Sequence, residues 1–102
     1  MIVSGGENVY PREVEDVLFE HPDILEAAVI GVPDDKWGER VHAVLVPRAG
    51  LTPDMDSMKT FTRKRLAGYK LPKTMENVTE LPKNAAGKVA KNVLRESWAG
   101  RQ

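Results

Sequence analysis

Two short segments contain residues whose types and spacing could support chemistry. Residues 81–91, LPKNAAGKVAK, predict a small, mobile loop that carries Lys88 after two alanines and a glycine. A lysine there could bring a positive charge to an anionic group, and its small neighbours would allow a close approach. Residues 4–11, SGGENVYP, contain the pair Gly5 and Gly6, which indicates a turn. Taken alone, the lysine is better explained as an ordinary surface residue.

Motifs for phosphate and calcium binding do not fit the sequence. The phosphate-loop pattern G-x-x-x-x-G-K-[ST] would need a glycine in place of Pro82 and a hydroxyl in place of Val89. Residues 54–56, DMD, begin like a calcium loop, but the sixth position is Lys59 instead of glycine. Neither motif therefore predicts a cofactor or metal site.

Composition indicates one small domain without cysteine chemistry. A length of 102 residues is enough for one core, and the lack of cysteine excludes disulfides, thiolate catalysis and cysteine-ligated zinc. His21 and His42 are too isolated to suggest a metal site, so we assign them surface or structural roles. No apolar run is long enough to span a membrane and no signal peptide is recognisable, so we expect a cytoplasmic protein.

The net charge is zero, but the charges are unevenly distributed. Residues 1–58 hold 4 Lys+Arg and 12 Asp+Glu, a balance of −8, whereas residues 59–102 hold 11 and 3, a balance of +8. Two interpretations are open: the second part binds an anion, or the two parts attract each other across the folded domain.

Periodicity predicts both helices and strands. Pro11 favours the start of a helix. Val14, Val17 and Leu18 follow at the i, i+3, i+4 spacing of one apolar face. Met55 and other apolar residues repeat near helical spacing further on, and we interpret the methionines as core filler. The predicted elements are a hairpin in residues 1–9, helices over 11–20, 54–67 and 89–98, and strands over 24–32, 41–46 and 74–81.

Together these elements predict an α+β fold. We expect an N-terminal β-hairpin followed by a roughly three-stranded sheet packed with three helices, as a single domain over residues 1–102. Because the chain starts directly in a strand-like segment, we expect Met1 to be an internal residue of a longer protein.

Five segments occur in the order found in one enzyme superfamily. The segments are MIVSGGENVYP followed by Glu13-Val14-Glu15, a strand over residues 28–32 followed by Pro33-Asp34, Trp37-Gly38-Glu39, YKLPK from Tyr69 to Lys73, and LPKNAAGK over residues 81–88. With them the chain resembles the small C-terminal domain of the adenylate-forming enzymes, which include acyl- and aryl-CoA synthetases, firefly luciferase and peptide-synthetase adenylation domains. The segment SGGENVYP is more similar to fatty-acyl- and aryl-CoA ligases, and the resemblance covers nearly the whole chain.

The resemblance implies a mobile lid that works with a large N-terminal domain of the same enzyme. That domain would hold ATP, Mg²⁺ and the acyl substrate, and the lid alone would bind no cofactor. A carboxylate and ATP first give an acyl-adenylate and pyrophosphate. The lid then rotates, and the thiol of coenzyme A attacks the acyl-adenylate and releases AMP. The isolated domain would have no ligase activity.

One role implied by the resemblance belongs to Lys88. This residue matches the lysine that would bridge the reacting carboxylate and the α-phosphate, where an ammonium stabilises developing charge. Gly87 would let the loop approach closely. Lysines at this position are acetylation targets in the family, so a lysine acetyltransferase and a deacetylase are implied partners at Lys88.

A second implied site is the one that forms the thioester. Gly5 and Gly6 match the face where the pantetheine arm of coenzyme A passes close to the backbone. Glu7 and Asn8 would orient this turn. Around the nucleotide of coenzyme A, the resemblance implies aromatic rings for adenine and cations for the phosphates: Trp37, Arg40, Tyr69 and Lys70.

Alternatives from other classes are a stand-alone anion- or nucleic-acid-binding module that uses the basic second part, and a dimerisation module. RNA binding on a sheet would need aromatic residues at strand centres. The sequence instead places Tyr10, Trp37, Tyr69 and Trp98 near the ends of elements or on a helix. We therefore expect no nucleic-acid partner.

Overall fold

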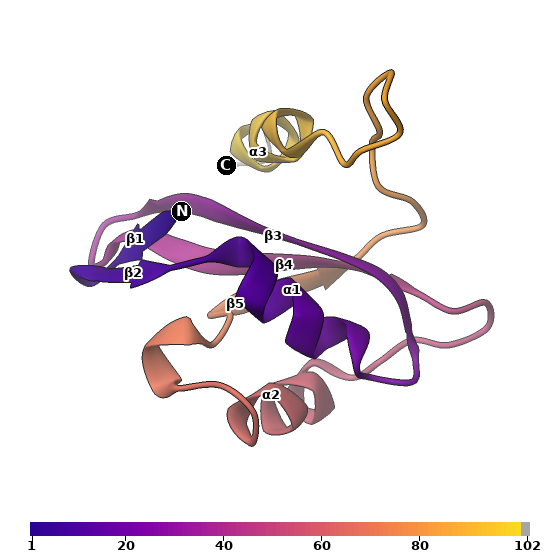
Figure 1. The fold of residues 1–102 in the computed structure, drawn as a ribbon, viewed down its shortest axis with the longest axis horizontal. Coiled ribbons are helices and arrows are strands. Elements are labelled where there is room, and N and C mark those ends of the chain that lie inside the picture. The colour runs from indigo at the N-terminus through magenta and orange to yellow at the C-terminus, as the bar shows by residue number, and fades with distance from the viewer. Residues whose placement is uncertain (101–102) are drawn as a thin grey trace.

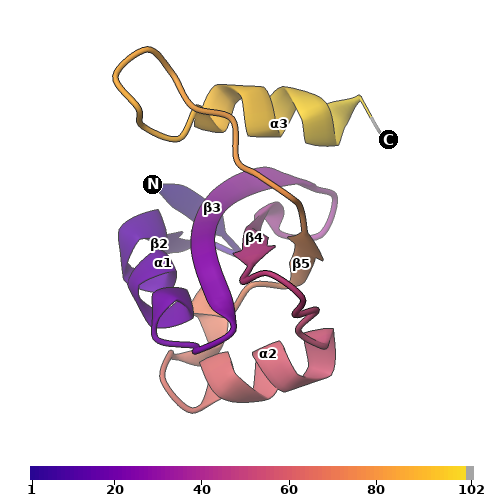
Figure 2. The ribbon, with the colours of Figure 1, turned by 90° about the vertical axis from the view of Figure 1, so that its right-hand side faces the viewer.

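Residues 1–100, described by a computed structural model, form a five-stranded sheet with helices on both faces (Figures 1 and 2). The longest strands, β3 (Ile24–Asp34) and β4 (Gly38–Pro47), pair antiparallel along their length. The other elements are β1 (Ile2–Ser4), β2 (Glu7–Val9), α1 (Pro11–Phe19), α2 (Met55–Arg63), a 3-10 helix η1 (Gly68–Lys70), β5 (Thr74–Asn77) and α3 (Lys91–Ala99).

β4 is the central strand of the sheet. One of its edges is occupied by β3. The other edge is shared by β5, which runs parallel to it over residues 42–45, and by β1, which meets it at Ser4 and Gly38. β2 pairs with β1 and completes the strand order β2-β1-β4-β3. The N-terminal hairpin is therefore an extension of the main sheet.

Side chains of β3 and β4 alternate between two buried layers. On one face, Val29 belongs to a core that includes Leu18 of α1 and Met58 of α2. On the other face, Ile30 belongs to a second core that includes Leu94 of α3. Figure 2 shows α3 on one side of the sheet and α1 and α2 on the other. Because both faces are covered, the central stretches of these strands, residues 27–32 and 41–46, are mostly apolar instead of alternating with polar residues.

The predicted α+β class is confirmed, and so are the N-terminal hairpin and the three helices. The sheet is larger than expected, since the hairpin joins the other strands through Ser4 and Gly38. Met58 is completely buried and Met55 packs against the same core, which confirms the interpretation of these methionines as core residues.

β5 is shorter than the strand predicted over residues 74–81. Its pairing with β4 ends where the Val78 N–H donates to the Leu45 carbonyl at 2.7 Å. Val78 and Leu81 then pack into the core beneath α3, and Pro82 has no N–H to continue a strand. After β5 the chain crosses to the face of the sheet that α3 covers, and the apolar residues of this segment pack against the core there (Figure 2).

The helices differ from their predicted ranges mainly at one end. α2 begins after Asp54, whose carboxylate accepts the Ser57 N–H at 3.4 Å, and it ends at Arg63. α3 begins two residues later than predicted because Val89 still pairs with Lys83 in a β-bridge. Within residues 1–100, no helix combines the length and apolar character needed to cross a membrane.

The acidic and basic parts of the chain pair with each other in the folded domain. Among residues 1–100, carboxylates of the first 58 residues form ion pairs with lysine or arginine of the later part at Arg65–Glu20, Lys70–Glu13, Lys83–Glu26 and Lys91–Glu15. Of the two interpretations of the charge asymmetry, attraction across the fold therefore has direct support.

The turn between β3 and β4 is held by the carboxylate of Asp34. Its Oδ1 accepts the N–H groups of Lys36 at 2.8 Å and Trp37 at 2.9 Å. Arg40 lies across the turn, with Nη1 3.5 Å from Oδ2. The hydrogen bond from the Trp37 N–H, aided by Lys36 and Arg40, holds the pKa of Asp34 below its ordinary value of 3.8. These bonds fix the backbone at Trp37.

Leu45→Ala tests the importance of the two-sided core. Leu45 is 0 % exposed, so we expect the truncation to lower the free energy of unfolding by about 2–5 kcal/mol. The matched control is Leu25→Ala in the neighbouring strand, where the side chain is 49 % exposed and the expected loss is about 0.5 kcal/mol or less. Urea denaturation of both variants measures the difference, and equal losses would contradict the core assignment.

Asp34→Asn tests the carboxylate in the turn. The folded-state pKa is lowered, so its charge stabilises the fold above the ordinary pKa of 3.8, and this stabilisation disappears as the pH falls through the folded-state value. We expect the variant to be less stable than the parent at pH 7 and the gap to close in acid. Urea midpoints measured along a pH series check this. If the difference in urea midpoint between the variant and the parent did not change with pH, the negative charge of Asp34 would not be the source of the stabilisation.

Candidate functional site

The segment that carries Lys88 is a closed hairpin loop. Lys83 pairs with Val89, and the N–H of Asn84 donates to the Lys88 carbonyl at 2.8 Å. The side-chain oxygen of Asn84 accepts the N–H groups of Ala86 at 2.9 Å and Lys88 at 3.1 Å. Gly87 has a φ of +80°, which glycine adopts without strain. The loop therefore has a defined shape that presents Lys88 near its end.

Asn84 is a residue that the sequence interpretation missed. Asparagine is favoured in turns because its side chain accepts hydrogen bonds from backbone N–H groups just ahead. An asparagine three residues before a glycine was the available signal. Its two hydrogen bonds are local, so they could have been proposed from sequence alone.

The side chain of Lys88 is exposed beside a cavity of about 580 Å³. Within residues 1–100, no hydrogen bond or ion pair engages its ammonium group. The cavity lies between α1, β3 and the hairpin, and its lining includes Arg12, Glu15, Asp16, Phe19, Glu26 and Lys88. The lysine is thus available to an anionic ligand or to another protein domain.

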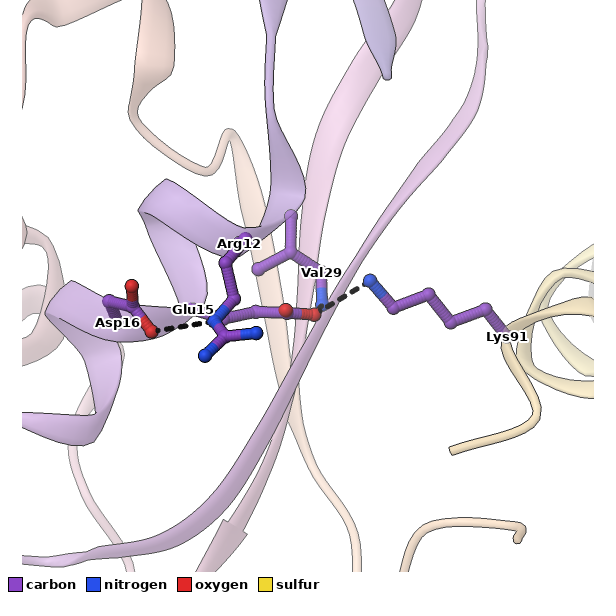
Figure 3. A network of polar contacts seen from close by, with 5 residues as sticks. All are labelled: Arg12, Glu15, Asp16, Val29 and Lys91. Atoms are coloured by element: carbon purple, nitrogen blue, oxygen red, sulfur yellow. Dashed lines mark hydrogen bonds and ion pairs between the residues drawn. The ribbon is translucent and has the colours of Figure 1, made fainter. Parts of the chain in front are cut away.

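Two lysine–glutamate pairs hold the legs of this hairpin. On one leg, Lys83 lies 2.6 Å from Glu26 of β3. After the other leg, Lys91 lies 2.8 Å from the Oε2 atom of Glu15, which also accepts the Val29 N–H at 2.9 Å (Figure 3). The pairs connect the hairpin to α1 and β3.

The glycine pair forms the turn between β1 and β2. Gly5 and Gly6 have φ values of +60° and +82°, in the left-handed region. The Gly5 N–H donates to the Trp37 carbonyl at 2.9 Å, and a Cβ at Gly5 would lie only 2.7 Å from the Trp37 ring. Gly5 is therefore required both by backbone conformation and by close packing.

A cavity of about 270 Å³ lies beside this turn. It brings together four of the residues predicted for coenzyme A binding or its support, and it adds Ser4, Gly68 and Lys73. Lys73 was missed, although it belongs to the YKLPK segment; its Nζ lies 4.5 Å from the centre of the Trp37 ring. The predicted residues in the lining are Gly5, Glu7, Trp37 and Tyr69. The other two predicted turn residues, Gly6 and Asn8, lie on the same hairpin outside this lining.

Arg40 and Lys70 do not line this cavity. Arg40 contacts Asp34 and lies over the Trp98 ring, 5.3 Å from its centre, beside a separate cavity of about 590 Å³. Lys70 lies 2.6 Å from Glu13, and the hydrogen bond to that carboxylate raises the pKa of Lys70. Among the cations near the glycine turn, Lys73 is the one that the fold directs to the cavity.

The two candidate regions lie toward different ends of the domain. Figure 1 shows the turn between β1 and β2 at one end of the long axis and the loop before α3 toward the other end.

The sequence matches the family described as the AMP-binding enzyme C-terminal domain over residues 13–88. It is 50 % identical over 98 residues to a feruloyl-CoA synthase from Amycolatopsis and 50 % identical over 96 residues to an indoleacetate–CoA ligase from Aromatoleum aromaticum. These alignments cover 96 % and 94 % of this chain, but 20 % and 19 % of the relatives. The chain thus spans about a fifth of their length.

Solved structures give the same result. A fatty acyl-CoA synthetase from Mycobacterium tuberculosis matches with a TM-score of 0.91 and 44 % identity, over 99 % of this chain and 20 % of that one. An o-succinylbenzoate-CoA synthetase from Bacillus subtilis, in complex with an acyl-adenylate, matches with a TM-score of 0.87 and 42 % identity, over 92 % and 19 %. This chain therefore belongs to the AMP-binding enzyme C-terminal domain family.

Proposed function

We propose that this chain is the C-terminal lid of an ATP-dependent acid–CoA ligase, and that its two regions serve successive half-reactions. Family membership and the activities named for its relatives support this function. The observation that carries the division of roles is that the loop before α3 and the turn between β1 and β2 lie toward different ends of the domain (Figure 1). Rotation of the lid would bring each region in turn to one reaction centre.

Lys88 would act in the formation of the acyl-adenylate. Attack of a carboxylate on the α-phosphate of ATP brings two anions together, and a positioned ammonium stabilises the charge that develops. Lys88 is exposed near the end of a closed loop and its ammonium has no ion pair within residues 1–100, so it is free to enter such a site. ATP, Mg²⁺ and the acid would be held by the large N-terminal domain.

The glycine turn would act in thioester formation. The pantetheine arm of coenzyme A would pass along this turn, where the space beside Gly6 is open and the Trp37 ring packs against Gly5. The adjacent cavity offers the rings of Trp37 and Tyr69 for adenine and the ammonium of Lys73 for a phosphate. Arg40 and Lys70 remain predicted phosphate contacts, but each would have to keep or exchange its present carboxylate partner.

The relatives suggest the class of acid. Two are named for feruloyl and indoleacetate substrates and one solved structure for a fatty acyl substrate, so we propose a fatty or aromatic carboxylic acid. We also propose that acetylation of Lys88 would switch the enzyme off, since it removes the charge on which adenylate formation depends.

Lys88→Ala tests the adenylation role in the full-length ligase. We expect adenylate formation, measured by pyrophosphate exchange, to fall on the order of 10²–10³-fold. Thioester formation from a supplied acyl-adenylate should be retained. Lys64→Ala, at an exposed lysine after α2, is the control and should leave both steps unchanged. Intact adenylate formation with failed thioester formation would show that the assigned role is wrong.

Gly5→Ala tests the thioester role in the same enzyme. The new Cβ would press on the Trp37 ring, so we expect thioester formation to slow by roughly 10–100-fold while adenylate formation is kept. Gly50→Ala is the control, because Gly50 also has a positive φ, +79°, but no atom within 4 Å of the new Cβ. Equal slowing of both half-reactions by Gly5→Ala would contradict a local effect on the thioester site.

A further inference from the structure

Glu15 connects three elements of the domain through one carboxylate oxygen. Its Oε2 accepts the N–H of Val29 on the outer edge of β3 at 2.9 Å and lies 2.8 Å from Nζ of Lys91, the first residue of α3 (Figure 3). Its own backbone belongs to α1. Segments 14 and 76 residues away from Glu15 along the chain are therefore joined at one point.

The hairpin that carries Lys88 depends on such side-chain contacts for its direction. In the described chain, the backbone hydrogen bonds of residues 83–90 are all made with residues 82–94, so they set the shape of the hairpin and not its orientation on the domain. Figure 2 shows this loop extending beyond the sheet and α1. Orientation is left to the packing of α3, to Leu81 and Val89, which pack with the core beneath α3, and to the pairs Lys91–Glu15 and Lys83–Glu26.

Of these two pairs, the one at Glu15 is the stronger anchor. The side chains of Glu15 and Lys91 are 13 % and 30 % exposed, compared with 34 % and 38 % for Glu26 and Lys83. Less exposed charges are screened less by water and salt. The Val29 N–H also fixes the orientation of the Glu15 carboxylate, whereas no backbone group does this for Glu26 within residues 1–100.

The Glu15–Lys91 pair also affects the start of α3, because Lys91 is the first residue of that helix. A cation at the first residue of a helix is unfavourable, because the helix N-terminus carries partial positive charge. Lys91 has this position in α3, and the Glu15 carboxylate supplies the compensating negative charge. The pair thus stabilises the start of α3 where it is joined to the Lys88 hairpin.

We propose that Glu15 is a positioning residue for adenylate formation: through Lys91 it sets the direction in which the hairpin carries Lys88. This inference rests on the adenylation role proposed for Lys88. Glu15 itself touches no reacting atom. It acts on one half-reaction only, because the glycine turn lies toward the other end of the domain and is fastened by Trp37 and Gly38 (Figure 1).

Glu15→Gln in the full-length ligase tests the proposal. Glutamine keeps the size of the side chain and an oxygen for the Val29 N–H, but it removes the charge that holds Lys91. We expect kcat for adenylate formation to fall roughly 10–100-fold, because a displaced catalytic group loses alignment with the reacting atoms. The KM for ATP and the rate of thioester formation from a supplied acyl-adenylate should stay near the parent values.

Lys91→Met should give the same defect without touching the Glu15–Val29 hydrogen bond, and it keeps the proposal testable if Glu15→Gln folds poorly. The double variant should be little worse than either single variant, because both remove one interaction. Lys91→Arg should restore most of the rate. Glu20→Gln is the matched control, since it removes the charge of the exposed Arg65–Glu20 pair at the end of the same helix, outside the lining of the Lys88 cavity, and should change neither half-reaction.

Proportional slowing of both half-reactions would overturn the proposal, because it would indicate a general structural role. Normal adenylate formation in both Glu15→Gln and Lys91→Met would overturn it as well. Lys88→Ala, measured in parallel, distinguishes failure of the positioning role of Glu15 from failure of the adenylation role proposed for Lys88. If Lys88→Ala is impaired and the Glu15 and Lys91 variants are not, only the positioning role fails. If Lys88→Ala forms adenylate normally, the proposed function of the hairpin fails.

Discussion

The burial of β3 and β4 on both faces is the constraint on which the rest of this domain depends. Val29 faces a core closed by α1 and α2, and Ile30 faces a core closed by α3. Because no face of these strands is left to solvent, the chain must carry helices to both sides of the sheet. The crossing from β5 to α3 places the Lys88 hairpin on the side of α3. The junction of β1 with β4 places the glycine turn near the start of β4.

Ion pairs then connect the helices, strands and hairpin that hydrophobic packing has brought together. The excess of acid in the first part of the chain and of base in the second serves to join α1 and β3 to later segments, namely the end of α2, η1, the Lys88 hairpin and α3. Exposed pairs of this kind add little stability each. Their value here is geometric, since two of them hold the legs of the hairpin. Among the residues that the structure describes, Lys88 has no charged partner, while its neighbours Lys83 and Lys91 are paired.

The two regions proposed to serve different half-reactions need a rigid body between them. The register of β3 with β4 runs unbroken from Glu26 to Asp34, so a rotation of the domain would move both regions together. Local features then tune each region by itself: Asn84 shapes the lysine hairpin, and Asp34 holds the backbone at Trp37 beside Gly5. This separation is why variants at one region are expected to spare the half-reaction assigned to the other.

The sequence by itself determined the α+β class, the approximate helices and long strands, and the two segments proposed to be functional. Each of these depends on residues close together in the chain, through periodicity, turn-forming residues or short motifs. It could not select Lys73 over Lys70 at the glycine turn, or reveal the partnership of Glu15 with Lys91. Lys70 and Glu13 are 57 residues apart in the chain, and only the packing of η1 near the N-terminal segment makes them partners. The apolar pattern at Val78 and Leu81 likewise fitted a strand, whereas the tertiary structure uses it to cross the sheet. Contacts between distant segments are decided when two cores close around one sheet, and no local pattern encodes which charges then meet.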